Sequence, residues 1–336
     1  MAKWRGAWLA VLAGASVVAV AAPPGAEAPA QKAVDEAYAR HRTLQEGKNA
    51  DYIPALARVD PGLFGIALVT VEGRIIARGD VEVPFSIQSI SKVFTLARVI
   101  QDQGDRAVLD KVGVDATGQV FNSIVAIEQN RGKEMNPFVN PGAIATTSMV
   151  AGASPEEKWA QIIGIHEAFA GRKLEVNQEV YKSESETNGR NRAIAVLLHA
   201  YGRLYGDPAL ATDLYTRQCS INVTARDLAV MAATLANGGK NPVTGKQVMK
   251  SENVPEVLAV MATAGLYDVS GKWLFTTGLP AKSGVGGGIL AVSPGKFGIA
   301  AISPPLDKAG NSVKAQKAIA DVSNALGGNP YAPKPR

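Results

Sequence analysis

Apolar residues alternate with polar ones near both ends of the chain. Residues 64–71 and 74–78 show this alternation around the dipeptide Glu72-Gly73. Residues 290–292 and 297–302 repeat it around the turn sequence 293–296. A period of two is typical of strands with one buried face, and a short glycine-containing turn joins antiparallel neighbours. The sequence therefore predicts one β-hairpin from each end.

Helical spacing dominates the middle of the chain. Ser154 is followed by Pro155 and Glu157, an arrangement typical of a helix start with a capping box. Thr224 with Asp227 predicts a second such start. Apolar residues three and four apart predict helices within residues 154–166, 191–204, 224–238, 252–264 and 315–326.

This order of elements predicts an α+β fold. Strands from both chain ends form one antiparallel sheet sandwiched by helices, and a helical domain is inserted between them. We expect residues 46–95 and 262–330 to form the sheet domain and 96–261 the helical domain. A cleft should lie between the two. Residues 29–45 are expected to be a leader or linker.

The N-terminus resembles a secretory signal peptide over residues 1–28. Lys3 and Arg5 precede an apolar stretch at 7–22, and small residues then offer cleavage sites. The sequence therefore predicts a periplasmic or secreted protein with no membrane contact after signal removal. A single membrane anchor is the alternative, but the apolar stretch is shorter than the ~20 residues that a span needs.

Composition excludes several functional classes. The formal net charge is +5, to which Lys3 and Arg5 contribute two, and no basic run is present. We therefore expect no nucleic-acid partner. Cys219 is the only cysteine and lies in an apolar run, so it is expected in the core. The three histidines lie near no second metal-type ligand, so a nucleophilic mechanism needs another base.

The stretch "FSIQSISKVFTL" at 85–96 offers that base. On a helix, residues i and i+3 share a face, so the hydroxyl of Ser89 can meet the amine of Lys92. The neighbouring serines, Ser86 and Ser91, have spacings that do not bring the groups together. Ser89 should lie in the first turn of a helix that enters the core, where free N–H groups favour negative charge.

Lys92 can accept a proton near neutral pH only if its pKa falls from about 10.4 toward 7–8. Burial or a neighbouring cation would lower it, and Lys282 is a candidate for that cation. Tyr267 could relay the proton. The Ser-x-x-Lys spacing alone is unspecific, because it recurs at Ser293–Lys296. The later Lys282-Ser283-Gly284 adds the Lys-[Ser/Thr]-Gly element of serine β-lactamases and penicillin-binding proteins.

Within that superfamily the chain resembles the serine-dependent glutaminases. The resembling stretches include "GDVEVPFSIQSISKVF", "NPFVNPGAI", "SESETNGRNRAIA", "CSINVTARDLAVMAATLANGG" and "GLPAKSGVGGGI", and together they span most of the chain. The resemblance implies hydrolysis of L-glutamine to L-glutamate and ammonia, without metal or organic cofactor. It also implies a homodimer or homotetramer.

The same resemblance implies roles for individual residues. Ser89 is the expected nucleophile and Lys92 its base, Tyr267 assists proton transfer, and the N–H groups of Ser89 and Val285 form the oxyanion hole. Lys282 would act in catalysis or orient the Ser89–Lys92 pair. The expected substrate-binding residues are Tyr52, Gln88, Asn140, Glu184, Asn191, Tyr215 and Val285.

Two other functions stay open at this point. A periplasmic serine β-lactamase or D-alanyl-D-alanine peptidase would explain export and the Ser-Lys motifs. Its Ser-Asp-Asn element is missing, and Ser220-Ile221-Asn222 has only the spacing. A non-catalytic glutamine-binding protein is the second alternative, although both nucleophile and base are retained. Export also departs from the cytosolic bacterial glutaminases, which leaves the physiological role open rather than the reaction.

Overall fold

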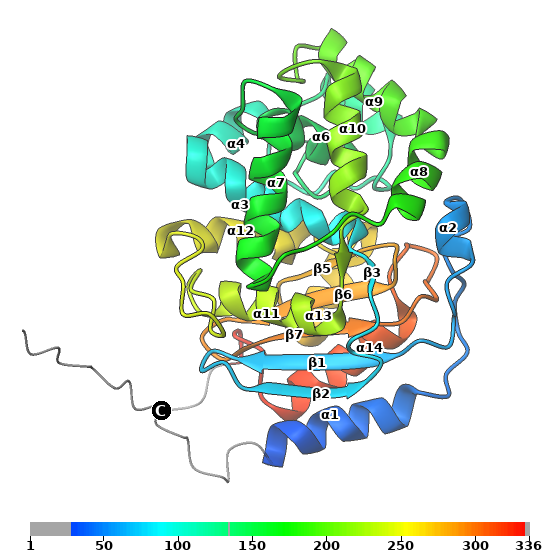
Figure 1. Cartoon of the computed structure of the whole chain (residues 1–336), viewed down its shortest axis with the longest axis vertical. Coiled ribbons are helices and arrows are strands. Elements are labelled where there is room, and N and C mark those ends of the chain that lie inside the picture. Colours follow the sequence, from blue (N-terminus) through cyan, green and yellow to red (C-terminus); the bar gives the residue numbers. More distant parts are fainter. Residues whose placement is uncertain (1–27, 134, 333–336) are drawn as a thin grey trace, which may run out of the picture.

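The computed structural model describes residues 28–133 and 135–332, and its central element is a five-stranded antiparallel sheet (Figure 1). The strands are β1 (Gly65–Thr70), β2 (Ile75–Gly79), β5 (Ala281–Ser283), β6 (Gly288–Ser293) and β7 (Phe297–Ile302), in the order β2-β1-β7-β6-β5. Both predicted hairpins are present, as β1–β2 and β6–β7. The β1–β7 pairing joins the two ends of the chain.

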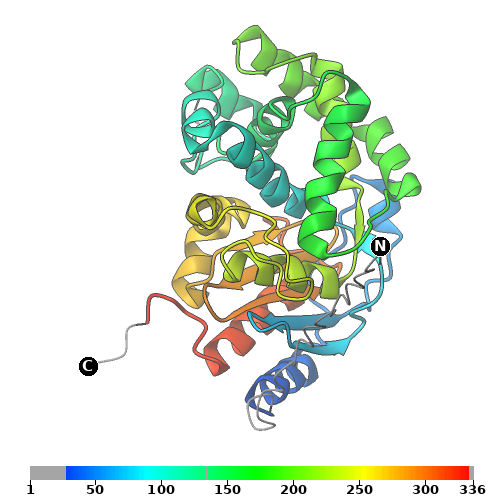
Figure 2. The ribbon, with the colours of Figure 1, turned by 60° about the vertical axis from the view of Figure 1, so that its left-hand side comes forward.

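Each face of the sheet is covered by helices. Ile66 and Leu68 of β1 point to the layer formed by α1 (Ala28–His41) and α14 (Val313–Ala325). Ala67 and Val69 belong to the opposite core, which includes α11 (Ala225–Ala236). This alternation is what the period-two pattern predicted. Figure 2 shows the sheet between its helical layers, and the predicted α+β fold class is confirmed.

Helix α11 lies directly on the sheet, although its residues were assigned to the predicted helical domain. Gly298 of β7 permits this contact, since an added Cβ would lie only 2.0 Å from the backbone nitrogen of Ala233. The helix therefore belongs to the sheet layer by position. Its predicted start is confirmed, because the Thr224 and Asp227 side chains form a complete capping box.

The N-terminal helix corrects the expectation of a leader or linker at residues 29–45. Residues 28–41 form α1, whose buried residues Ala30, Ala33, Val34 and Ala37 recur at helical spacing. Tyr38 stacks on Phe64, with ring centroids 5.1 Å apart. The apolar stripe is short and made mostly of alanines, which weakens its signal in the sequence. The predicted signal peptide lies outside the described residues except for Ala28.

Most of the remaining helices form a block above the sheet (Figure 1). They are α2 (Pro54–Ala57), α3 (Ser91–Gln103), α4 (Asp105–Lys111), α5 (Ile124–Asn130), α6 (Asn140–Ser148), α7 (Pro155–Ala170), α8 (Gln178–Thr187), α9 (Gly189–Ala200), α10 (Pro208–Cys219) and α12 (Val254–Ala264). The other helix, α13 (Ser270–Thr277), is not part of this block, because its Trp273 packs in the core formed with α1 and α14. The predicted starts at Ser154 and Thr224 are N-caps, whereas the helix predicted at 191–204 already begins at Gly189 and ends at Ala200. A short pair, β3 (Phe85–Ser86) with β4 (Asn222–Val223), precedes the Ser89 segment.

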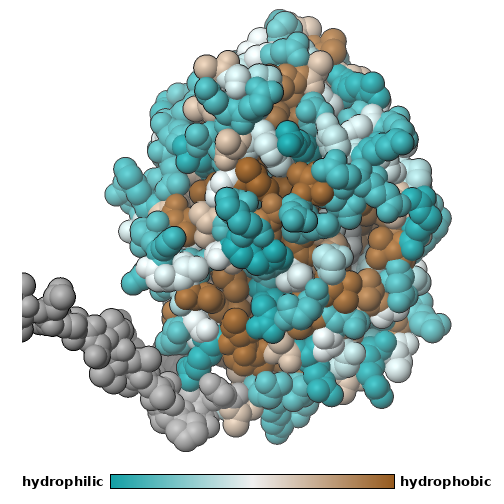
Figure 3. Space-filling view, viewed as in Figure 1, coloured by the Kyte–Doolittle hydropathy of each residue, from teal (hydrophilic) through white to brown (hydrophobic). Residues whose placement is uncertain are grey.

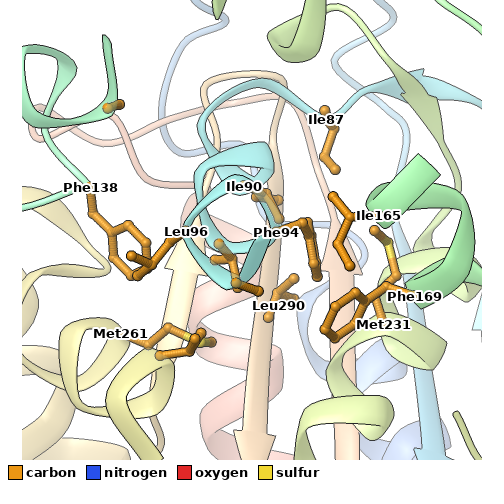
Figure 4. Packing of buried hydrophobic residues seen from close by; sticks show 14 of the residues in the cluster. Ile87, Ile90, Phe94, Leu96, Phe138, Ile165, Phe169, Met231, Met261 and Leu290 are labelled. Atoms are coloured by element: carbon orange, nitrogen blue, oxygen red, sulfur yellow. The ribbon is translucent and has the colours of Figure 1, made fainter. Parts of the chain in front are cut away.

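One hydrophobic core joins the helical block to the sheet. Phe94 of α3 packs on Phe169 of α7, with ring centroids 5.0 Å apart, and Leu290 of β6 belongs to the same cluster (Figure 4). Cys219 is buried in this core, as predicted. On the face seen in Figure 3, hydrophobic residues lie in separate groups between hydrophilic ones. Within the described residues no helix has both the length and the apolar content to span a membrane.

The docking of α1 can be tested with Val34→Ala. Val34 is fully buried, so removing two methyl groups should lower the free energy of unfolding by about 1.5–3 kcal/mol. Urea unfolding followed by circular dichroism measures this change. Lys32→Ala is the matched control, because Lys32 is exposed on the same helix and should change stability by less than about 0.5 kcal/mol. Equal stability of both variants would contradict the docked helix.

Candidate active site

The predicted site residues meet around one cavity of about 270 Å³ between the sheet and the helical block. Ser89, Gln88 and Val285 line its sheet side. The whole lining is Tyr52, Ile53, Gln88, Ser89, Phe121, Asn122, Asn140, Glu184, Thr187, Asn188, Arg190, Asn191, Tyr215 and Val285. Of the predicted residues, Lys92, Tyr267 and Lys282 lie behind this surface.

Ser89 lies in a tight 3₁₀ turn at 88–90, directly before α3. Gln88 has a φ of 49°, a left-handed conformation that is rare for residues other than glycine. Two glycines of the β5–β6 connection approach this turn closely. A Cβ on Gly284 would lie 2.7 Å from the Ile87 carbonyl oxygen, and one on Gly286 would lie 2.5 Å from that of Ser86. The glycines after Lys282-Ser283 therefore bring this connection against the Ser89 segment.

Lys92 is buried in the first turn of α3, with 1% of its surface exposed. Its amine donates hydrogen bonds to Asn140 Oδ1 (2.8 Å) and to the Phe138 carbonyl oxygen (3.2 Å). Burial lowers the pKa of Lys92 to about 7, although Cys219 and Glu184 act in the opposite direction. A substantial fraction of the amine is therefore neutral near pH 7 and can accept a proton.

Lys282 differs from its expected role as the neighbouring cation. It is fully buried, and its amine donates to the carbonyl oxygens of Gly265 (2.8 Å) and Ser283 (2.7 Å). Burial, and next the charge of Lys92, hold the pKa of Lys282 well below its usual value. Burial is the cause that lowers the pKa of Lys92, and Lys282 does not contribute to that shift.

Tyr267 lies beside Ser89 in a second strained conformation, with a φ of 57°. Burial raises its pKa to about 12, while the nearby hydroxyls of Ser89 and Ser283 partly offset the increase. Within residues 28–133 and 135–332, its buried hydroxyl makes no hydrogen bond of good geometry. The Lys282 amine lies 4.2 Å from the centre of its ring. Tyr267 therefore presents an unpaired phenol that stays protonated near neutral pH.

The opposite wall carries the polar groups expected to bind the substrate. Gln88 Nε2 donates to Glu184 Oε2 (3.2 Å), and Asn140 Nδ2 donates to Asn191 Oδ1 (3.0 Å). The hydroxyl of Tyr215 donates to Asn140 Oδ1 (3.1 Å). Burial raises the pKa of Glu184 to about 7, whereas Gln88 and Lys92 lower it. Asn140 thus connects the Lys92 amine to this wall.

The cavity also contains residues that the sequence analysis did not name. Phe121 packs against Tyr267, with ring centroids 4.8 Å apart, and Arg190 Nε donates to the Asn122 carbonyl oxygen (2.9 Å). No motif or periodic spacing in the sequence marks Phe121, Asn122 or Arg190 as site residues. Tyr52 is 53% exposed and lies at the mouth. Ser220 is fully buried and donates to the Thr216 carbonyl oxygen, so it supplies no second serine to the cavity.

Together these groups can perform acyl transfer. A serine hydroxyl, a lysine with a lowered pKa and a protonated phenol face one side of a cavity whose other side has a carboxylate and two carboxamides. The N–H of Val285 has no hydrogen-bond acceptor in the described part of the chain. It can serve a developing oxyanion.

Comparison with known proteins identifies the family. The family model for glutaminase matches residues 47–331. A glutaminase of Colwellia psychrerythraea is 56% identical over 299 residues, which cover 89% of this chain and 96% of that protein. A glutaminase of Mycobacterium ulcerans is 54% identical over 296 residues, covering 88% of this chain and 92% of the relative.

Solved structures agree with this result. The structure of the probable glutaminase ybaS superposes with a TM-score of 0.89 at 50% identity, covering 90% of this chain and 98% of that one. Mglu in its glutamate form superposes with a TM-score of 0.86 at 37% identity, covering 91% of this chain and 71% of that one. The resemblance to the serine-dependent glutaminases is thereby confirmed. This chain belongs to the glutaminase family of β-lactamase-like serine amidohydrolases.

Proposed function

We propose that the protein hydrolyses L-glutamine to L-glutamate and ammonia through an acyl-enzyme on Ser89. The observation that carries the residue roles is that Ser89 lies beside the Tyr267 hydroxyl and three residues before Lys92, whose buried amine has a pKa lowered to about 7. Neither the β-lactamase nor the binding-protein alternative is favoured by the relatives, which are glutaminases at 54–56% identity over most of the chain.

The polar wall would orient the free amino acid. The Glu184 carboxylate binds the α-ammonium group, and the carboxamides of Asn140 and Asn191 donate to the α-carboxylate. Gln88, Tyr215 and Tyr52 complete this shell. Because Glu184 and Asn140 are almost fully buried, pairing with a charged substrate replaces the solvation that they lack. This wall therefore favours a free α-amino acid over a residue within a peptide.

In the acylation step, Ser89 Oγ attacks the side-chain amide carbon while its proton passes to neutral Lys92. The N–H groups of Ser89 and Val285 stabilise the oxyanion. The C–N bond then breaks, and the leaving nitrogen takes a proton from Tyr267, which recovers one from Lys92. Water attacks the ester by the same route in reverse and releases L-glutamate. Lys282 holds the Gly265 and Ser283 backbone in place for this geometry.

We also propose export to the periplasm or medium and assembly as a homodimer or homotetramer. The basic and apolar N-terminal sequence supports export, and the family resemblance supports assembly. Cell fractionation with N-terminal sequencing tests the first part, and light scattering of the purified protein tests the second. A full-length cytosolic protein or a monomer would refute the corresponding part.

Ser89→Ala should remove turnover and keep the fold. Loss of the nucleophile should lower kcat by at least about 10⁴-fold, because no other serine replaces it in the cavity. Release of ammonia and glutamate from L-glutamine measures the rate, with L-asparagine as a second substrate. Ser251→Ala is the matched control and should retain activity, since Ser251 is exposed and does not line the cavity. Turnover by the Ser89 variant would exclude the serine mechanism.

The pH dependence should follow Lys92. Since Lys92 must be neutral and Glu184 ionised, and each has a pKa of about 7, kcat/KM should fall by up to about 100-fold per pH unit below pH 7 and level off above it. Glu184 raises the pKa of Lys92, so Glu184→Gln should move this limb to lower pH. A pH profile of both proteins measures the shift. If the acid-side fall in kcat/KM of the variant stays in place or moves to higher pH, Lys92 is not the base.

Glu184→Gln should mainly weaken substrate binding. Loss of a charge-assisted contact to the α-ammonium group costs about 1.5–3 kcal/mol, which corresponds to a KM increase of roughly 10–100-fold. Initial rates over a range of L-glutamine concentrations at pH 8 separate KM from kcat. Glu186→Gln, an exposed position on the same helix, is the control. An unchanged KM in the Glu184 variant would remove Glu184 from the ammonium site.

A further inference from the structure

A second, larger groove opens from the reaction centre. It has a volume of about 640 Å³ and is formed by residues 46–52 and 306–310 with Phe121, Val285 and Val313. It shares Tyr52, Phe121 and Val285 with the active-site cavity. Ammonia occupies about the volume of one water, roughly 30 Å³. The groove is therefore far larger than the leaving group of L-glutamine requires.

In the proposed binding mode the groove lies on the side of the scissile nitrogen. Glu184, Asn140 and Asn191, which receive the α-groups in the proposed function, line the active-site cavity but not the groove. Val285, whose N–H is proposed to bind the oxyanion, lines both, as does Tyr52 at the mouth. A γ-glutamyl group bound in the cavity therefore directs any substituent on its amide nitrogen toward the groove.

Gly310 keeps the boundary between groove and reaction centre open. Its φ is +96°, and an added Cβ would lie 3.6 Å from Tyr267 Cε2 and 3.7 Å from Val285 Cγ1. The turn that holds it is fixed by the Asp307 carboxylate, which accepts hydrogen bonds from the N–H groups of Ala309 and Asn311. The groove thus reaches the proposed proton donor with no side chain from this position in between.

Among the described residues, one cation in the groove has no partner. Lys48 pairs with Asp51, Glu46 pairs with Lys317, and Asp307 is occupied by backbone N–H groups and Gln316. Lys308 is exposed, and no ion pair or side-chain hydrogen bond involves it within the described residues. The groove therefore presents a free ammonium group two residues from Gly310, which suits an anionic substituent.

We propose that the protein also hydrolyses γ-glutamyl amides of α-amino acids, with the leaving amino acid in this groove and its carboxylate at Lys308. This rests on the proposed function, since the same Ser89 ester forms. Ser89 Oγ bonds to the γ-carbon, the C–N bond breaks, and the leaving amine takes one proton from Tyr267. Water then releases L-glutamate, so one water is consumed for each amino acid released.

The test compares γ-L-glutamylglycine, γ-L-glutamylmethylamide and L-glutamine as substrates of the full chain and of Lys308→Glu. Wild type should release glycine. The substitution should lower kcat/KM for γ-L-glutamylglycine about fivefold or more, and change the values for the uncharged methylamide and for L-glutamine less than twofold. Lys246→Glu makes the same charge change at an exposed position in a different groove and should leave all three substrates unaffected.

The outcomes separate this inference from the proposed function. Hydrolysis of L-glutamine without release of glycine from γ-L-glutamylglycine would overturn the inference alone. An equal loss on γ-L-glutamylglycine and on the methylamide would overturn the carboxylate site at Lys308. Folded wild type that hydrolyses none of the three substrates would instead refute the proposed function.

Discussion

The burial of Lys92 at the start of α3 is the constraint on which the site depends. Lowering its pKa from 10.5 to about 7 corresponds to about 5 kcal/mol against the charged amine. The protein can sustain that cost because α3 lies in the core that joins the helical block to the sheet. Phe94 and Leu96, on the same helix, are fully buried there. The same packing that holds the fold together therefore lowers the pKa of the proposed base.

The strained backbone conformations around Ser89 depend on the same packing. Gln88 and Tyr267, two of the three residues other than glycine with positive φ in the described chain, both flank Ser89. Such conformations cost about 1–3 kcal/mol each and persist only when the surroundings fix them. Here the β3–β4 pair and the close approach of Gly284 and Gly286 fix the turn. The strain places side chains from two distant segments against one hydroxyl.

The sequence predicted the parts of the fold that follow periodic patterns. The β1–β2 and β6–β7 hairpins, the caps at Ser154 and Thr224 and the buried Cys219 follow from local spacing. The docking of α1 could not be predicted, since its alanine-rich stripe is a weak signal and its partner α14 lies almost 300 residues away. The docking of α11 on the sheet depends on Gly298, whose role appears only when β7 is placed.

The candidate site divides in the same way. The Ser89–Lys92 spacing and the Lys282-Ser283-Gly284 element are local signals, and the family resemblance supplied the dispersed residues of the polar wall. No spacing indicates that Lys282 is fully buried, or that Phe121 packs on Tyr267, because both depend on which segments meet in space. The groove at Lys308 likewise could not be predicted from local spacing. Its formation requires residues 46–52 and 306–310 to lie together, which the Lys48–Leu306 bridge achieves. That bridge ties the entry segment of the chain to the edge of the reaction centre, so the space offered to a leaving group is set by tertiary contacts rather than by the catalytic motif.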